Sequence, residues 1–319
     1  MISRPLVWLV LLVGLYVAAA PRVAPYPPSL QQRAFPFVPP MSLHWKFAGL
    51  FTFPLYYCGL QPEGEAYRED CGQARRFEWW GGGRLLRPEA EHPFFLMGSD
   101  GLGRDQFSRL VEGGRVTLVA GVVAAGIAVL IGMLVGLFAG YGGLWVDGSV
   151  SAITTLVLTC PWIYLLLAIR SMLPLSMPQE TALLVVMGVS AGVGWPRPAI
   201  LFRALVKTAK EREFVLLSRT FGGGQWHIFR THLIPQLRHA AVAQFTTLAP
   251  QFVLAETTLS FLGLGVQEPG VSWGILLSAL RDVPVLFSHT WMALPCIPIA
   301  GVFFLMQWGS RLMQYTDES

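Results

Sequence analysis

The sequence predicts an all-α integral membrane protein with six transmembrane helices and a long insertion between the first and the second. Its composition suits a lipid-embedded chain, because 53% of the residues are hydrophobic and only 13% are charged. A soluble domain carries about 25% charged residues. The apolar residues also gather into runs near the ~20 residues that a helix needs to cross the hydrocarbon core. The eleven tryptophans fit anchoring at the membrane–water interface.

The first apolar run covers residues 6–20 and follows Arg4. Its modest length and its Ala18-Ala19-Ala20 ending also suit a signal peptide that is removed after export. We expect a retained first transmembrane helix over residues 1–20. A cleaved peptide would leave five helices in the same orientation.

Residues 21–115 form the insertion, which we expect to be extracytoplasmic. Stretches such as AFPFVPP and EWWGGGR are rich in proline, glycine and aromatic residues, so they predict a small irregular domain with turns. The insertion should end in a short interfacial helix formed by GSDGLGRD and the following QFSRLVEG, residues 98–113. Cys58 and Cys71 are close enough in sequence to form a disulfide in an oxidising compartment. The alternative is a pair of unlinked thiols.

Residues 116–309 predict a five-helix core. Its apolar spans are residues 118–140, 149–169, 181–199, 240–263 and 288–309. The third of these contains Arg197 between two prolines, which should bend or end the helix. In the first, Gly132, Gly136 and Gly140 recur every four residues, so one helix face would allow close approach of another backbone.

The loop between the spans 181–199 and 240–263 sets the orientation, because short cytoplasmic loops are enriched in lysine and arginine. It carries Arg203, Lys207, Lys210, Arg212, Arg219, Arg230 and Arg238. This loop should therefore be cytoplasmic. Counting spans from it places residues 21–115 outside and both termini in the cytoplasm, with a cytoplasmic tail over residues 310–319.

Several stretches can be read together: GSDGLGRD, AGYGGLWVD, GWP, KEREFV and ETTLSFLGLGVQEPGVSWG. In order and spacing they resemble the second permease subunit of dipeptide, oligopeptide and nickel ABC importers. The resemblance implies the type I ABC importer permease fold in the bacterial plasma (inner) membrane. It also implies four partners: a homologous permease, two ATPase subunits and an extracytoplasmic solute-binding protein. Peptides are the expected cargo, and nickel chelates or other peptide-like solutes are the alternatives.

The resemblance further implies that residues 206–235, approximately, form the loop that docks on the ATPase. Gly222 and Pro235 match the family pattern in register, whereas Leu216-Leu217-Ser218 stand where the family has Glu-Ala-Ala. The consecutive glycines allow a tight turn between two short helices. The residues expected to dock are Glu213, Phe214, Leu217, Ser218, Phe221, Gly222, Gly223, Trp226 and Pro235.

The span 240–263 carries polar residues that predict a substrate pathway, because polar groups within a bilayer are costly. Gln244, Thr247, Gln251 and Thr258 fall within about 60° of one another at about 100° per residue. The alternative is a hydrogen-bonded seam between helices. Glu256 points away from this stripe and would need a buried partner, for which Arg170 is the candidate.

The sequence also limits the chemistry. It has no Gly-x-x-x-x-Gly-Lys-Ser/Thr motif, so we expect no ATP binding, no cofactor and no catalysis by this chain. The histidines at 227, 232 and 239 lack the spacing of a metal site, and no basic cluster suggests nucleic-acid binding. Gly188-Val189-Ser190-Ala191-Gly192 matches a serine hydrolase motif, but we expect it inside a helix, where its small residues serve packing. A stand-alone secondary carrier would show inverted repeats, which we do not find.

Overall fold

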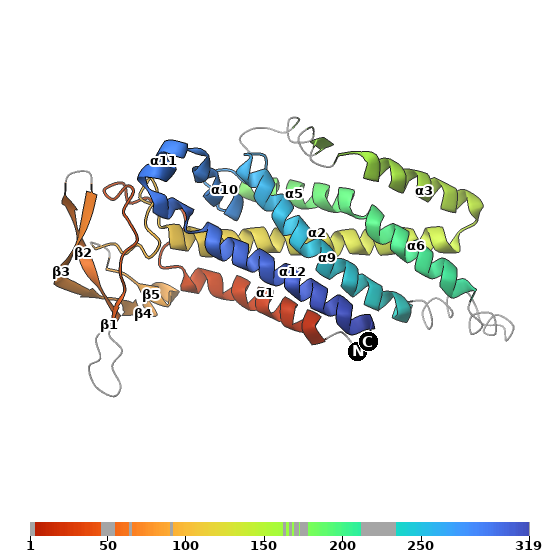
Figure 1. Ribbon diagram of the computed structural model, residues 1–319, viewed down its shortest axis with the longest axis horizontal. Coiled ribbons are helices and arrows are strands. Elements are labelled where there is room, and N and C mark those ends of the chain that lie inside the picture. The colour runs from red at the N-terminus through yellow and green to blue at the C-terminus, as the bar shows by residue number, and fades with distance from the viewer. Residues whose placement is uncertain are drawn as a thin grey trace. The chain divides into compact units, whose positions relative to one another are not determined.

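The computed structural model describes residues 4–45, 55–63, 66–89, 92–161, 164–165, 168, 172, 178–211 and 234–318. The chain divides into two compact units (Figure 1). The helical unit comprises Met1–Leu11, Ala120–Glu256 and Phe303–Ser319. The mixed unit comprises Leu12–Val119 and Thr257–Val302 and includes all the described strands.

Long helices dominate the described part of the chain. They are α1 (Arg4–Val23), α2 (Gln106–Tyr141), α3 (Leu144–Thr159), α5 (Gln179–Gly194), α6 (Pro196–Lys210), α9 (Ile234–Phe261) and α12 (Cys296–Glu318). By length and composition, three described segments can cross a membrane: Gln106–Tyr141, Leu183–Lys210 and Thr290–Gly309. Val13–Val23 and Leu144–Thr159 are shorter apolar helices. The helical membrane architecture is confirmed, and the count of six spans stays a prediction.

The helix boundaries differ from the expected ones at three places. Of residues 98–113, expected as a separate interfacial helix, residues 98–105 are not helical and residues 106–113 form the first turns of α2 without a break. The expected tail, residues 310–319, is helical to Glu318 as the end of α12. The span expected over residues 181–199 is broken at Trp195, and α6 then begins at Pro196, a position where the missing N–H of proline costs nothing.

Close packing of α2 on α6 follows from the glycines predicted to share one face. A Cβ atom built on Gly132 would lie 2.7 Å from the Trp195 carbonyl oxygen, and one on Gly136 would lie 2.6 Å from that of Ala199. A Cβ atom on Gly188 or Gly192 would meet nothing within 4 Å among the described residues. The packing prediction thus fits α2, whereas the described part of the chain shows no close neighbour at these two glycines of α5.

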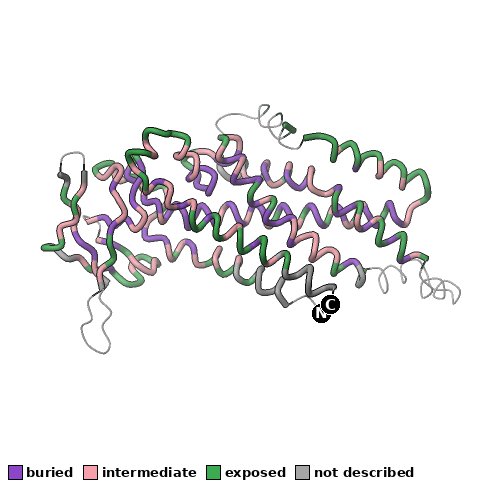
Figure 2. The backbone as a smooth tube through the Cα atoms, in the orientation of Figure 1, coloured by how far each residue is buried: buried purple, intermediate pink, exposed green. Residues whose placement is uncertain are grey.

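The helices of the helical unit differ in how much of their surface is buried. Helix α2 is buried along much of its length, whereas α3 lies beside α6 and is mostly exposed (Figure 2). Only Thr154 is buried among the described side chains of α3, and its apolar residues Ile153 and Leu156 are exposed. An apolar surface of this kind suits contact with lipid or with another membrane subunit.

The mixed unit contains a three-stranded antiparallel sheet where the sequence predicted an irregular domain. Strands β1 (His44–Trp45), β2 (Leu55–Glu63) and β3 (Ala66–Arg76) pair in the order β1-β2-β3. The structure joins Cys58 on β2 to Cys71 on β3 by a disulfide. The alternation that marks a strand is weak in β3, AYREDCGQARR, where charged residues occupy both faces, so no strand was predicted there.

An aromatic core supports this sheet. It is formed by Val38, Met41, Tyr57, Phe77, Phe94 and Phe95. The Tyr57 hydroxyl donates a hydrogen bond of 2.8 Å to the carbonyl oxygen of His92, so its polar tip is satisfied within the core. Strands β4 (Glu78–Trp79) and β5 (Leu86–Arg87) form a second small sheet, connected through a 3-10 turn at Gly81–Gly83, as the EWWGGGR stretch predicted.

The second chain segment of the mixed unit consists of short helices that follow α9. They are α10 (Trp273–Ser278), η3 (Ala279–Arg281), α11 (Val283–Ser288) and η4 (Thr290–Ala293). Trp273 links this segment to the first turns of α2 by hydrogen bonds. Its indole N–H donates to the Leu110 carbonyl oxygen at 2.9 Å. Its backbone N–H donates to the Thr117 hydroxyl at 3.2 Å.

Candidate functional site

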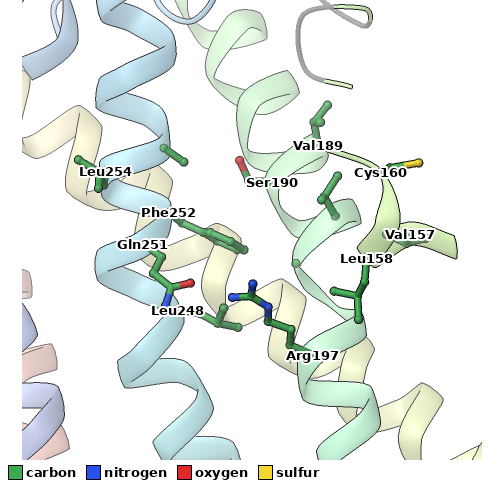
Figure 3. Close-up of a pocket in the computed structure, with 13 residues that line it drawn as sticks. Val157, Leu158, Cys160, Val189, Ser190, Arg197, Leu248, Gln251, Phe252 and Leu254 are labelled. Carbon is green, nitrogen blue, oxygen red and sulfur yellow. The ribbon is translucent and has the colours of Figure 1, made fainter. Parts of the chain in front are cut away.

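A pocket of about 340 Å³ lies within the helical unit, between α9 and the junction of α5 with α6 (Figure 3). Its volume falls in the range of about 300–1,000 Å³ that is usual for small-molecule sites. Its lining residues are Val157, Leu158, Cys160, Val189, Ser190, Val193, Gly194, Arg197, Leu248, Gln251, Phe252, Leu254 and Ala255. The walls are therefore mostly apolar, with three polar side chains placed among them.

Arg197 is the single charged residue of this lining. It is the second residue of α6, directly after the helix break at Trp195, and its side chain extends toward α9 (Figure 3). It forms no hydrogen bond or ion pair with any residue in the described part of the chain. Trp195 keeps a right-handed helical backbone (φ −64°, ψ −26°), so α6 continues closely from α5 and Arg197 lies one turn beyond the last pocket-lining residues of α5.

Gln251 and Ser190 supply the uncharged polar groups. Gln251 is exposed on α9, and its amide extends into the same space as the Arg197 guanidinium (Figure 3). Ser190 is 8% exposed on α5. Together with Arg197 they offer donors and one amide acceptor to a ligand that has both polar and apolar parts.

The predicted polar stripe on α9 is only partly represented in this pocket. Gln251 lines it, whereas Gln244, Thr247 and Thr258 do not. The Thr247 hydroxyl donates a 2.9 Å hydrogen bond to the Ala243 carbonyl oxygen of its own helix. Arg197 was not predicted as a site residue. The sequence analysis considered it only as the residue between two prolines that should bend or end the helix.

Other predicted site residues lie outside the described residues. These are the docking-loop residues Glu213, Phe214, Leu217, Ser218, Phe221, Gly222, Gly223 and Trp226, and also Arg170. Pro235 lies in the first turn of α9, as expected for a helix start. Glu256 is buried at 1% exposure, and its proposed pairing with Arg170 stays a prediction. Ser190 lies inside α5, not on the strand–turn–helix element that a hydrolase nucleophile requires.

Charged side chains hold the C-terminal end of α6 against α2 and α3. Asp147 near the start of α3 accepts hydrogen bonds from Arg203 and from Lys207, the latter at 2.5 Å. Lys210 donates to the carbonyl oxygen of Gly140, at the end of α2, at 3.0 Å. The sequence placed these cations in a loop, but the structure shows them as the last turns of a helix that is tied to α2 and α3.

A second charged cluster lies in the mixed unit and joins two of the motif stretches. Asp100 accepts from Arg104 at 2.7 Å and from Arg109 at 2.9 Å. Glu268 accepts from the same two arginines, at 2.5 Å from Arg104 and at 2.9 Å from Arg109. The four side chains alternate in charge around a closed ring, so GSDGLGRD and the QEPG turn after α9 are held together by electrostatics.

Asp105 caps the start of α2 beside this ring and gives a prediction of pH dependence. Its carboxylate accepts from the Ser108 backbone N–H at 2.8 Å, and burial raises its pKa from 3.8 to about 6. Between these two values the folded state holds a proton more firmly than the unfolded state. Stability should therefore decrease as the pH rises from about 4 to about 6, and then level off.

The variant Asp105→Asn provides the comparison, because asparagine caps a helix as well as aspartate but does not titrate. We expect the wild type to lose stability relative to this variant across that window. Thermal unfolding of the purified chain in detergent between pH 4 and pH 7.5 measures the difference. Parallel curves for the two proteins would contradict the pKa assignment.

Comparison with known proteins adds a family and several relatives. Residues 132–313 match the model of the binding-protein-dependent transport system inner membrane component family. A dipeptide transport system permease protein of Bacillus subtilis is 39% identical over 209 residues, which cover 66% of this chain and 62% of that protein. A di/tripeptide transport system permease protein of Pseudomonas aeruginosa is 30% identical over 272 residues, 85% of this chain and 73% of that protein.

The coverage of these relatives is partial. The chain spans less than two thirds of the length of the Bacillus subtilis protein and of a Brucella ovis peptide permease protein, of which 65% is covered at 35% identity. Among solved structures, an amino acid ABC transporter aligns over 66% of this chain and 94% of that chain, with 16% identity and a TM-score of 0.49.

Proposed function

The chain belongs to the family of binding-protein-dependent transport system inner membrane components, and we propose that it is the permease subunit of an ATP-driven importer of peptides. The observation that carries this proposal is the family match over residues 132–313, which covers most of the helical unit. Relatives that match this region are described as dipeptide or di/tripeptide permease proteins. The pocket beside α9 supports the same function, because it offers polar groups in a mostly apolar wall.

In this proposal the chain conducts the cargo and does no catalysis. It pairs with a homologous permease, two ATPase subunits and an extracytoplasmic solute-binding protein. Residues 206–235 dock on an ATPase, so that closure of the ATPases moves α6 and α9, which flank this loop. The lysine and arginine residues of this region support a cytoplasmic location, with both termini on the same side.

The remaining candidate functions receive less support. A serine hydrolase would need Ser190 on a sharp turn beside a base, whereas the residue lies inside α5. A relative from Pectobacterium atrosepticum, described as a glutathione transport system permease protein, is 30% identical over 193 residues. Glutathione is itself a small peptide-like solute, so this relative fits the proposed class of cargo, which is peptides.

Reconstitution tests the proposed function. The chain is expressed with a homologous permease, ATPase subunits and a solute-binding protein from the same genome, and the complex is placed in vesicles. We expect co-purification of two ATPase subunits and peptide uptake that requires both ATP and the binding protein. A Ser218→Cys variant should crosslink to an ATPase subunit. Uptake driven by an ion gradient without ATPases, or a crosslink from the opposite side of the membrane, would refute the proposal.

A further inference from the structure

Four side chains that can bind a metal ion come together on the three-stranded sheet of the mixed unit (Figure 1). They are His44 on β1, Cys58 on β2, and Glu69 and Cys71 on β3. Their candidate ligand atoms all lie within 4.8 Å of one another. Sequence spacing did not reveal this group, because its members belong to three strands that only the folded sheet brings together.

The pairing of the strands explains why these side chains meet. His44 on β1 pairs with Tyr56 on β2, and the two rings stack with their centroids 5.4 Å apart. Glu69 and Cys71 are two residues apart on β3, so both side chains point to the same side of that strand. Cys58 lies where the register of β2 against β3 shifts, and its sulfur reaches Cys71.

The distances between the ligand atoms suit a tetrahedral zinc ion. His44 Nε2 lies 3.7 Å from a carboxylate oxygen of Glu69 and 3.9 Å from Cys71 Sγ. Zinc bonds of about 2.0–2.3 Å place neighbouring ligand atoms of a tetrahedron about 3.4–3.8 Å apart. Small side-chain rotations close the difference. The other carboxylate oxygen of Glu69 accepts from the Ser42 backbone N–H at 2.8 Å, which orients this ligand.

The disulfide determines when zinc can bind. A metal ion binds the thiolate form of cysteine, whereas the sulfur atoms of Cys58 and Cys71 are bonded to each other in this structure. The disulfide and the ion are therefore alternatives at the same two atoms. The side chains of His44 and Glu69 are 35% and 27% exposed, and Cys71 is exposed, so solvent can deliver both a reductant and an ion.

We propose that the reduced chain binds one Zn²⁺ through His44, Cys58, Glu69 and Cys71, so that the ion takes the place of the disulfide. Two thiolates, an imidazole and a carboxylate complete the four ligands of a closed zinc site. The disulfide links β2 to β3, whereas the ion links β1 to both of them. The inference does not depend on the transport function proposed above, because it concerns the sheet alone.

A protein dithiol is the reductant that this exchange requires. One of its thiolates attacks a sulfur of the Cys58–Cys71 bond, and its second thiol then releases the chain from the mixed disulfide. Two electrons pass to the chain, the two sulfurs of the reductant become a disulfide, and Cys58 and Cys71 become thiols. Binding of Zn²⁺ then releases the two thiol protons to water.

Titration of the purified chain in detergent with Zn²⁺ tests the proposal. One sample keeps the disulfide, and the other is reduced by a phosphine that is removed before the titration. We expect one Zn²⁺ per reduced chain, bound at least a hundredfold more tightly than by the disulfide form. His44→Gln and Glu69→Gln should each weaken zinc binding by the reduced chain tenfold or more, because each removes one of four ligands.

Two variants provide the controls. Asp70→Asn removes a carboxylate beside Glu69 that is bonded instead to Gln61 and to the Gly72 backbone N–H, so zinc affinity should change less than twofold. The double variant Cys58→Ser/Cys71→Ser keeps the two free cysteines of the chain and measures their background. Zinc binding by the reduced chain that does not exceed this background would overturn the proposal. Equal affinities of the reduced and disulfide forms would also overturn it, as would full affinity in both His44→Gln and Glu69→Gln.

Trypsin cleavage provides a second measurement that detects loss of the sheet itself. Arg68 and Arg75 lie on β3, so they should be cleaved faster after reduction, when the link between β2 and β3 is broken. Addition of Zn²⁺ should restore the slow cleavage of the disulfide form in the wild type but not in His44→Gln. Rapid cleavage of the reduced wild type in the presence of Zn²⁺ would show that the four side chains do not hold the ion.

Discussion

Replacing Gly136 with leucine should separate α2 from α6 and lower the stability of the helical unit by about 3 kcal/mol or more, at the upper end for overpacking. A Cβ atom at this position would lie 2.6 Å from the Ala199 carbonyl oxygen, 2.7 Å from Phe202 Cβ and 2.9 Å from the Arg203 backbone nitrogen. Two of these three atoms belong to the backbone of α6, so no side-chain rotation relieves the clash. The helices have to move apart, and contact along the whole glycine face is lost.

The matched control is Gly188→Leu on α5, where a Cβ atom would meet nothing within 4 Å among the described residues. Both variants place the same side chain in an apolar helix, so a difference between them reports packing and not hydrophobicity or helix propensity. Thermal unfolding of the purified chain in detergent measures the effect. A Gly136→Leu protein that unfolds at the wild-type temperature would show that α2 and α6 do not pack as described.

The helices were predictable because a bilayer forces a simple rule on the sequence. Backbone groups in lipid have to bond within the segment, so each long apolar run becomes a helix. The runs over residues 6–20 and 118–140 accordingly lie within α1 and α2. Helix ends were less predictable, because an apolar run does not show how far polar residues next to it continue the helix, as residues 106–113 do in α2.

The insertion was the least predictable region. The β2–β3 pair joins residues close in sequence, such as Glu63 and Ala66, and its disulfide bridges a separation of 13 residues, whereas the aromatic core against it joins residues as distant as Val38 and Phe95. Local composition, rich in proline and glycine, suggested irregular structure instead. The cysteine spacing raised the disulfide as one of two alternatives, and only the pairing of β2 with β3 brings Cys58 and Cys71 together.

The residues that line the candidate site could be predicted only in part from helical spacing. Helical spacing grouped Gln251 on one face of α9 with Gln244, Thr247 and Thr258, of which only Gln251 lines the pocket. Spacing describes one helix at a time, whereas a pocket depends on several. Arg197 lies on α6 and Gln251 on α9, and only the packing of these helices brings both residues to one pocket.

The charged ring of the mixed unit should be the most sensitive electrostatic feature of the chain. Arg109 is 3% exposed and bonds both carboxylates, Asp100 at 2.9 Å and Glu268 at 2.9 Å. Replacing Arg109 with leucine would leave two acidic groups close together with only Arg104 to neutralise them. Removing one partner from a buried ion pair costs about 3–5 kcal/mol, and we expect Arg109→Leu to lie in this range.

Arg115→Leu is the matched control, because it removes the same charge from the same helix. Arg115 is paired with Glu112 at 3.1 Å, and its side chain is 42% exposed whereas that of Glu112 is 9% exposed, so its loss should cost less than the loss of Arg109, which bonds two carboxylates. Denaturation of both variants, at low and at high salt, separates the two cases, since screening weakens an exposed pair more than a buried one. Equal and small effects of the two substitutions would show that the ring contributes no more than a surface contact, and that GSDGLGRD and the QEPG turn are held together by Trp273 and its neighbours instead.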